Sequence, residues 1–211
     1  MVYTAREGEE LDEWQGLPWG LYSSHLEISR AALRGNIEKM LAHLDGRCTL
    51  LPTVKANAYG LGMEPVARLL TEEYDVAELA VAQVYEGIRL RRAGFDCGLL
   101  VMGAVQDAAI EASLDAGLKL TVFQLEAAEK INAAARDKGQ VCPVHIKIDT
   151  GLNRLGVPVG EALDALLKGL KELTYLEVEG VFTHFATSNV YNDPFTLAQF
   201  SAFKAGVAQV R

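Results

Sequence analysis

Residues 79–123 read LAVAQVYEGIRLRRAGFDCGLLVMGAVQDAAIEASLDAGLKLTVF, and this stretch decides the fold class. It holds three short apolar runs that are typical of buried strands, at residues 79–82, 98–102 and 118–123. Two segments with helical spacing separate the runs, at residues 84–93 and 107–116, and each is followed by a glycine. Apolar strands that alternate with helices predict a parallel sheet covered by helices, which is an α/β fold.

The same alternation continues on both sides of this stretch. Ser29 is a suitable N-cap for a helix whose apolar face would carry Leu33, Ile37, Met40, Leu41 and Leu44. Pro194 is typical of the first turn of a last helix. Further strands are expected at residues 21–28, 50–58, 144–149 and 176–185, and further helices at residues 63–70, 126–138 and 160–170.

Two architectures fit this order of elements: an open doubly wound sheet and a (β/α)8 TIM-type barrel. An open sheet binds ligands at one switch point, whereas barrel chemistry is spread over the carboxyl ends of several strands. The unusual polar residues follow or end three different expected strands, which favours the barrel: Lys55, Asp149, Arg154 and His184. Only about six of the eight βα units of a barrel are expected, so the sequence predicts an incomplete barrel with bare edge strands over residues 21–211.

The composition is that of a globular protein with a large core, because 50% of the residues are hydrophobic and 23% are charged. The formal net charge of −8 argues against a nucleic-acid-binding surface, which needs clustered Lys and Arg. No apolar run approaches the roughly 20 residues of a membrane span, and the polar first residues are unlike a signal peptide. We therefore expect a cytoplasmic protein that binds neither nucleic acid nor membrane.

Residues 1–20 lack helical or strand periodicity, and we interpret them as an acidic extension in which Trp14 and Trp19 would serve as docking points. The three cysteines are an odd set without CxxC spacing, and the four histidines show no metal-ligand spacing. The sequence therefore predicts no metal site and buried, unpaired thiols in a reducing compartment, at Cys48, Cys97 and Cys142.

A second informative segment is Val54-Lys-Ala-Asn-Ala-Tyr-Gly-Leu-Gly62, at the end of the strand expected at 50–58. A lysine there would be desolvated, which favours a neutral amine that can attack an aldehyde, and the small residues after it allow backbone N–H groups to approach an anion. The segment resembles the cofactor-lysine segment of alanine racemases. The resemblance implies that Lys55 carries pyridoxal 5′-phosphate as a Schiff base and that the Tyr59 hydroxyl binds its phosphate. From the residues alone, Tyr59 is equally a packing residue of a turn, and Leu61 stands where the family usually has histidine.

A third segment is His145-Ile-Lys-Ile-Asp-Thr-Gly-Leu-Asn-Arg-Leu-Gly156. By spacing alone it favours a lysine–aspartate pair at a strand end and an arginine exposed on a loop, with an anion clamp as the alternative. The segment resembles the DTG-x-x-RLG stretch of alanine racemases. The resemblance implies that Arg154 contacts the phenolic oxygen of the cofactor and the substrate carboxylate, and that Lys147 is a candidate for carbamylation that steadies the arginine.

The fourth segment, Gly180-Val-Phe-Thr-His-Phe-Ala-Thr-Ser188, has a histidine on an apolar strand, which is most simply a core residue. It resembles the HFA-x-A-D segment of the same family, although Asn189 replaces the usual aspartate. The resemblance implies that His184 lies beside the cofactor ring. The spacing of Gln199 and Phe203 matches the family's Q-x-x-x-F helix, for which we expect a structural role.

The resemblance covers residues 21–211 and only the first part of a family member, without two further barrel units and a carboxyl-terminal β domain. It implies a homodimeric enzyme that interconverts L-alanine and D-alanine for cell-wall synthesis. In the family the second catalytic base, a tyrosine, comes from the unmatched part, so we expect residues 1–211 by themselves to racemise poorly. The sequence leaves open four alternatives: a serine racemase, a non-catalytic pyridoxal-phosphate-binding barrel, an amino-acid decarboxylase and a barrel fragment that binds nothing.

Overall fold

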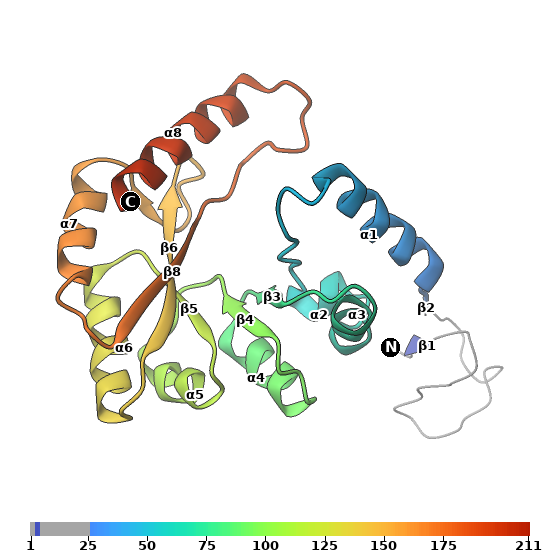
Figure 1. Cartoon of the computed structure of the whole chain (residues 1–211), viewed down its shortest axis with the longest axis horizontal. Coiled ribbons are helices and arrows are strands. Elements are labelled where there is room, and N and C mark those ends of the chain that lie inside the picture. The colour runs from blue at the N-terminus through green and yellow to red at the C-terminus, as the bar shows by residue number, and fades with distance from the viewer. Residues whose placement is uncertain (1–2, 5–25) are drawn as a thin grey trace. The chain divides into compact units, whose positions relative to one another are not determined.

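The computed structural model describes residues 3–4 and 26–211. The chain divides into two compact units, Met1–Val76 and Ala77–Arg211 (Figure 1). Strand β1 (Tyr3–Thr4) pairs in parallel with β2 (Leu26–Glu27), which is the described part of the strand expected at 21–28. The rest of the acidic extension, with Trp14 and Trp19, lies outside the described residues.

The first unit contains α1 (Arg30–Leu44), α2 (Lys55–Tyr59), α3 (Met63–Arg68) and the π-helical turn η2 (Leu69–Glu73). The N-cap predicted for α1 is confirmed, because the Ser29 hydroxyl accepts a hydrogen bond of 3.1 Å from the Ala32 N–H. The strand predicted at 50–58 is wrong: a single bridge residue, Thr53, precedes a helical turn that begins at Lys55. A short apolar run such as 50–54 has no clear helical or strand period, so periodicity alone could not decide its structure.

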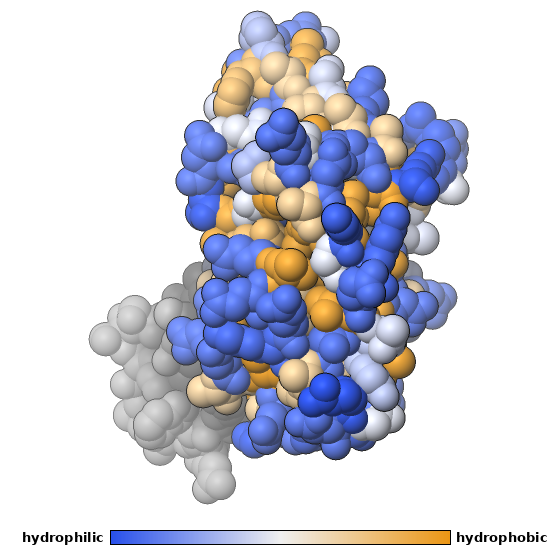
Figure 2. All heavy atoms as spheres, turned by 90° about the vertical axis from the view of Figure 1, so that its left-hand side faces the viewer, coloured by the Kyte–Doolittle hydropathy of each residue, from blue (hydrophilic) through white to orange (hydrophobic). Residues whose placement is uncertain are grey.

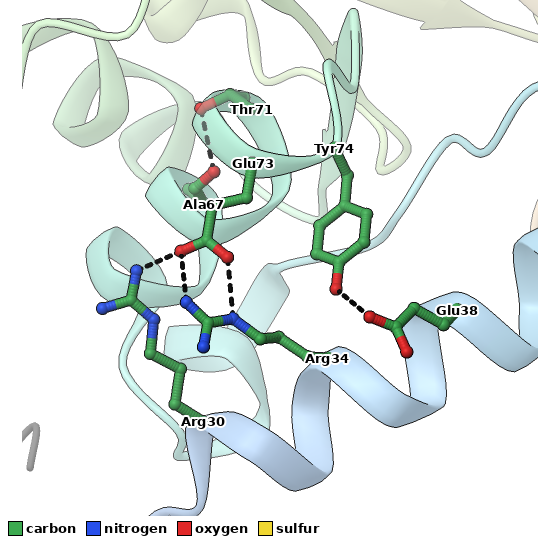
Figure 3. A network of polar contacts seen from close by, with 7 residues as sticks. All are labelled: Arg30, Arg34, Glu38, Ala67, Thr71, Glu73 and Tyr74. Atoms are coloured by element: carbon green, nitrogen blue, oxygen red, sulfur yellow. Dashed lines mark hydrogen bonds and ion pairs between the residues drawn. The ribbon is translucent and has the colours of Figure 1, made fainter. Parts of the chain in front are cut away.

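Polar contacts join α1 to the end of η2 (Figure 3). The Glu73 carboxylate accepts hydrogen bonds from Arg30 and from Arg34, whose Nε lies 2.8 Å from Oε2. The Tyr74 hydroxyl donates to the Glu38 carboxylate over 3.1 Å. These contacts supplement a partly apolar face, in which Leu33, Ile37 and Leu44 of the predicted set are half-buried whereas Met40 and Leu41 are exposed.

The second unit is built on a parallel sheet with the strand order β3-β4-β5-β6-β8, and the short β7 pairs with the end of β6. The strands are β3 (Glu78–Val81), β4 (Gly98–Val101), β5 (Lys119–Val122), β6 (Cys142–Asp149), β7 (Val157–Pro158) and β8 (Leu176–Phe182). The parallel sheet and its alternation with helices confirm the predicted α/β architecture, a partial barrel. Among the described residues no pairing joins β3 to β8, so the sheet is not closed.

The helices of this unit form an outer layer in which each packs against the next (Figure 1). They are α4 (Val84–Arg92), α5 (Ile110–Asp115) after the 3-10 turn η3 (Asp107–Ala109), α6 (Leu125–Asp137), α7 (Glu161–Leu170) and α8 (Pro194–Val210). Polar side chains dominate the face seen in Figure 2, with apolar ones scattered among them. The last three residues of β3, β4 and β5 are all buried, and because successive strand residues point to opposite faces, both faces of the sheet are covered here.

A cluster of charged side chains joins the first residues of β3 and β5 to the middle of β8. The Lys119 ammonium donates hydrogen bonds to the carboxylates of Glu78 and Glu179. Two glycines leave room for this cluster. A Cβ atom at Gly98 would lie 2.6 Å from Glu78 Cγ, and one at Gly180 would lie 2.5 Å from Cε1 of the His145 ring. The expected catalytic residues of this unit lie at or near the carboxyl ends of the strands instead.

The expectation of three buried thiols is wrong for two of the cysteines. Cys48 is exposed and Cys97 is half-buried, whereas Cys142, the first residue of β6, is buried. Burial raises the pKa of the Cys142 thiol to about 12. Of the helices that the structure describes, none combines the length and the apolar character needed to cross a bilayer.

Candidate functional site

The segment that follows Lys55 is a left-handed turn. Ala56, Asn57, Ala58 and Tyr59 all have φ between 51° and 56°. This region costs residues other than glycine and asparagine roughly 1–2 kcal/mol. Consecutive strained residues persist only where the surrounding structure holds them, and they gather at functional sites. The backbone therefore marks the Lys55 turn as a candidate site independently of its sequence motif.

Hydrogen bonds within the segment hold this turn together. The Ala58 N–H donates to the Val54 carbonyl over 2.8 Å, and the Gly62 N–H donates to the Asn57 carbonyl over 2.9 Å. The Asn57 side-chain oxygen accepts from the Met63 N–H over 2.9 Å, at the first residue of α3. These N–H groups are engaged inside the turn, so the expected presentation of backbone donors to an anion is wrong for them.

Lys55 follows the buried Val54 but is itself half-buried, so the lysine is less desolvated than expected. Its Nζ atom lies 5.8 Å from the centroid of the Tyr59 ring, within the range of a cation–π contact. Tyr59 is 67% exposed. The left-handed turn thus brings an accessible amine and an accessible phenol to the same place.

Replacement of Asn57 by alanine should loosen this turn. The change removes the hydrogen bond to Met63 and the residue type that best tolerates a left-handed backbone, at a combined cost of about 2 kcal/mol. The control is Asn153→Ala, because Asn153 has a similar φ of 55° but no side-chain hydrogen bond to a described residue. Urea denaturation should give the larger loss of unfolding free energy for Asn57→Ala, and equal losses would contradict the capping role.

The loop after β6 is organised by the carboxylate of Asp149. Its Oδ1 atom accepts hydrogen bonds from the N–H groups of Gly151 at 3.0 Å and Asn153 at 3.1 Å. The loop returns to β6 where Pro158 of β7 pairs with Asp149. Asp149 therefore shapes the loop that carries Arg154.

Arg154 is exposed and makes no hydrogen bond or ion pair with any residue in the described part of the chain. It lines an open pocket of about 680 Å³ at the carboxyl ends of β5 and β6. The lining of this pocket is mainly apolar and includes Phe123, Leu125, Leu155, Val157 and Leu166. A guanidinium without a counter-ion beside an apolar lining is suited to a small molecule that carries an anionic group.

Lys147 and His184 belong to neighbouring strand ends. Lys147 lies inside β6 with 4% of its surface exposed, and its Nζ is 4.4 Å from the centroid of the Phe182 ring at the end of β8. His184 is exposed and lies two residues beyond β8. The structure therefore places Lys147, Arg154 and His184 at or near the carboxyl ends of the adjacent strands β6 and β8. Lys55 and Tyr59 belong to the first unit, Met1–Val76.

Three polar residues of the second unit have contacts that the sequence did not reveal. Gln199 on α8 is buried and bonds to segments that follow both β6 and β8, and Thr150 and Thr183 link these two segments. The signal in the sequence for the role of Gln199 was a polar residue within the apolar face of an expected helix. In the described part of the chain, no three or more His, Cys, Asp or Glu side chains are grouped so as to hold a metal ion.

Comparisons with known proteins agree on one family. The family model for the alanine racemase N-terminal domain matches residues 28–211. The chain is 38% identical to the alanine racemase of Desulforamulus reducens over 84% of its length, and 37% identical to that of Symbiobacterium thermophilum over 90%. These alignments cover 48% and 50% of the two relatives, so the chain spans about half the length of the curated relatives it matches.

Solved structures give the same result. The chain resembles the alanine racemase of Clostridium difficile with a TM-score of 0.80 and 35% identity, over 86% of this chain and 47% of that one. It resembles the Bacillus anthracis alanine racemase, solved with bound L-Ala-P, with a TM-score of 0.79 and 30% identity. That match covers 85% of this chain and 46% of the other.

Proposed function

Because the chain belongs to the alanine racemase family, we propose that it binds pyridoxal 5′-phosphate and acts in an enzyme that interconverts L-alanine and D-alanine. The observation that carries the proposal is the strained left-handed turn in which an accessible lysine amine faces a tyrosine ring. An amine, a phenol and a nearby strained backbone fit an aldehyde phosphate cofactor. The D-alanine produced would serve cell-wall synthesis.

Lys55 would have two tasks in this enzyme. Its amine would bind the cofactor aldehyde, which can reach it because the side chain is only half-buried. When bound, the cofactor would supply a conjugated system that stabilises negative charge at the substrate α-carbon. The Lys55 amine would remove or return the α-proton on one face of the substrate. The exposed Tyr59 hydroxyl would donate to the cofactor phosphate.

The residues of the second unit would orient the reactants. The two-pronged guanidinium of Arg154 would bind the substrate carboxylate and the phenolic oxygen of the cofactor. Carbamylation of Lys147 would replace a buried positive charge by a negative one, which could then hold Arg154. His184, beyond the end of β8, would pack beside the cofactor ring.

Inversion of the α-carbon also requires a base on the opposite face of the substrate. We propose that a second subunit supplies it, which makes a homodimer the working form. The amino-acid substrate would be alanine in the first place and serine as the runner-up. The runner-up outside the racemases is a barrel that binds the cofactor and catalyses nothing.

The test is covalent trapping of the cofactor on the purified chain. We expect borohydride reduction in the presence of pyridoxal 5′-phosphate, followed by peptide mapping, to label the peptide that contains Lys55. Lys55→Arg should abolish this label, while Lys39→Arg, at an exposed lysine of α1, should leave it unchanged. A label spread evenly over surface lysines, or its persistence in Lys55→Arg, would overturn the assignment. Labelling at Lys55 without racemisation of alanine or serine, in a dimer that also contains the second base, would favour the non-catalytic protein.

A further inference from the structure

Gln199 is a buried side-chain amide on α8, with 1% of its surface exposed. A buried amide must find partners for its oxygen and for its two N–H groups, or it destabilises the fold. Two backbone groups beside Gln199 fix the orientation of its side-chain amide. The Ala186 N–H can only donate, so it must face Oε1, at 2.9 Å. The His184 carbonyl can only accept, so it must face Nε2, at 3.5 Å. Gln199 is thereby held on the segment that includes His184.

The other N–H of Gln199 starts a directional chain of hydrogen bonds. Nε2 lies 3.3 Å from the Thr150 hydroxyl, which lies 2.9 Å from the Thr183 hydroxyl. The Thr183 hydroxyl donates its proton to the Ile148 carbonyl over 2.8 Å. Because that proton is committed, Thr150 must donate to Thr183 and accept from Gln199. Each hydrogen bond in this series therefore has only one possible donor and one possible acceptor.

These bonds begin where the sheet ends. The last paired residues of β6 and β8 are Lys147 and Phe182, so the segments beyond them have no ladder bonds to each other. The chain from Gln199 through Thr150 and Thr183 replaces those bonds. Phe195 of the same helix packs against the segment that follows β6, because a Cβ atom at Gly151 would lie 3.1 Å from its ring. The helix therefore fixes the spacing between the two segments that carry the expected site residues.

We propose that Gln199 is a positioning residue that sets the placement of the Arg154 loop relative to His184, a role that rests on the proposed function of those two residues. Thr150 lies four residues before Arg154, and Gln199 bonds to His184 itself. Loss of the amide would free both segments to move separately. The positions of the guanidinium and the imidazole would then no longer be coupled.

The same helix offers a matched control in Gln209. Its Oε1 accepts from the Gly160 N–H at 2.9 Å, and its Nε2 donates to the Gly160 carbonyl at 3.3 Å and to Asp164 at 2.8 Å. Gln209 thus makes three comparable bonds, but to the start of α7 rather than to the strand ends. A purely structural glutamine on α8 should behave like Gln209.

The experiment compares Gln199→Leu with Gln209→Leu by NMR of the 211-residue chain. In Gln199→Leu we expect the Ala186 amide to exchange with solvent about tenfold faster, and the Arg154 Nε and His184 ring signals to move. In Gln209→Leu only residues 160–164 should respond. If the Arg154 and His184 signals move no more in Gln199→Leu than in Gln209→Leu, the positioning role is refuted.

A second variant covers the case in which Gln199→Leu does not fold. Thr150→Val keeps the shape of the side chain and removes the central hydroxyl of the chain, so it should move the same Arg154 and His184 signals. Unmoved signals in folded Thr150→Val would also refute the proposal. In a parallel titration, Gln199→Leu should weaken pyridoxal 5′-phosphate binding about tenfold relative to Gln209→Leu. Absence of binding by the unchanged chain would refute the proposed function, and the NMR comparison would still decide the role of Gln199.

Discussion

Gly156→Ala is expected to destabilise the second unit by about 3 kcal/mol and to displace the loop that carries Arg154. Two penalties coincide at this position. A Cβ atom would lie 2.5 Å from the Asp149 nitrogen and 2.8 Å from the Ile148 carbonyl carbon, and backbone atoms of a central strand cannot give way cheaply. The φ of Gly156 is also +130°, which L side chains rarely adopt. The unfolding free energy from urea titration measures the loss.

Gly160→Ala is the control that separates the backbone penalty from the steric penalty. Gly160 has a φ of +102°, but a Cβ atom there would have no other atom within 4 Å. It should therefore show backbone strain alone, about 1 kcal/mol. Equal losses for the two variants would mean that the loop moves away from β6 at little cost, contrary to its close packing on Asp149.

The elements of the second unit could be predicted because each strand and helix carries its own signal. The buried runs at 79–82 and 98–102 agree with β3 and β4 to within one residue, and the helix from Val84 ends one residue earlier than expected. Alternation of the elements then leaves only parallel architectures. Closure of the barrel is a property of strand pairing over long distances, which periodicity does not report.

The Lys55 turn could not be predicted in the same way. Asn57 and the glycines at 60 and 62 favour a left-handed backbone, but Ala56, Ala58 and Tyr59 do not. Their conformation is imposed by the hydrogen bonds of the segment rather than by propensity. The candidate residues themselves were found by resemblance. The role of Gln199 depends on partners 13 to 49 residues away, and no local pattern shows them.

Lys119→Met is expected to destabilise the second unit by about 2 kcal/mol at neutral pH. Lys119 is 19% exposed and pairs with two carboxylates, and its loss leaves Glu78 and Glu179 facing each other without a cation. Removal of one partner from a fully buried pair costs about 3–5 kcal/mol, and the smaller figure allows for the 34% exposure of both carboxylates. Lys130→Met is the control, because Lys130 also pairs with two acids, Asp107 and Glu126, but is well exposed. It should have little measurable effect.

The pH dependence of the Lys119→Met effect follows from the pKa shift of Lys119. Burial lowers the pKa of Lys119, but hydrogen bonds to Glu179 and Glu78 outweigh burial and raise it above the ordinary 10.5. The native state therefore holds this proton more tightly than the unfolded chain, so the contribution is complete below pH 10.5 and is lost as the pH rises through the native pKa. Above pH 7, the difference between the unchanged chain and Lys119→Met should shrink only in that alkaline range. A difference that shrinks already between pH 7 and pH 9 would contradict the pairing.

His145 provides an independent readout of the same cluster. Burial lowers its pKa below 6.5, and the positive charge of Lys119 lowers it further, against the opposing effect of Glu78 and Glu179. Lys119→Met removes the cation and leaves both carboxylates, so the pKa of His145 should rise in an NMR titration. In the unchanged chain the lowered pKa means that the contribution of His145 to stability is complete above pH 6.5. This contribution is lost as the pH falls through the native pKa of His145. An unchanged His145 titration in Lys119→Met would show that His145 is not coupled to the charged cluster of Lys119, Glu78 and Glu179.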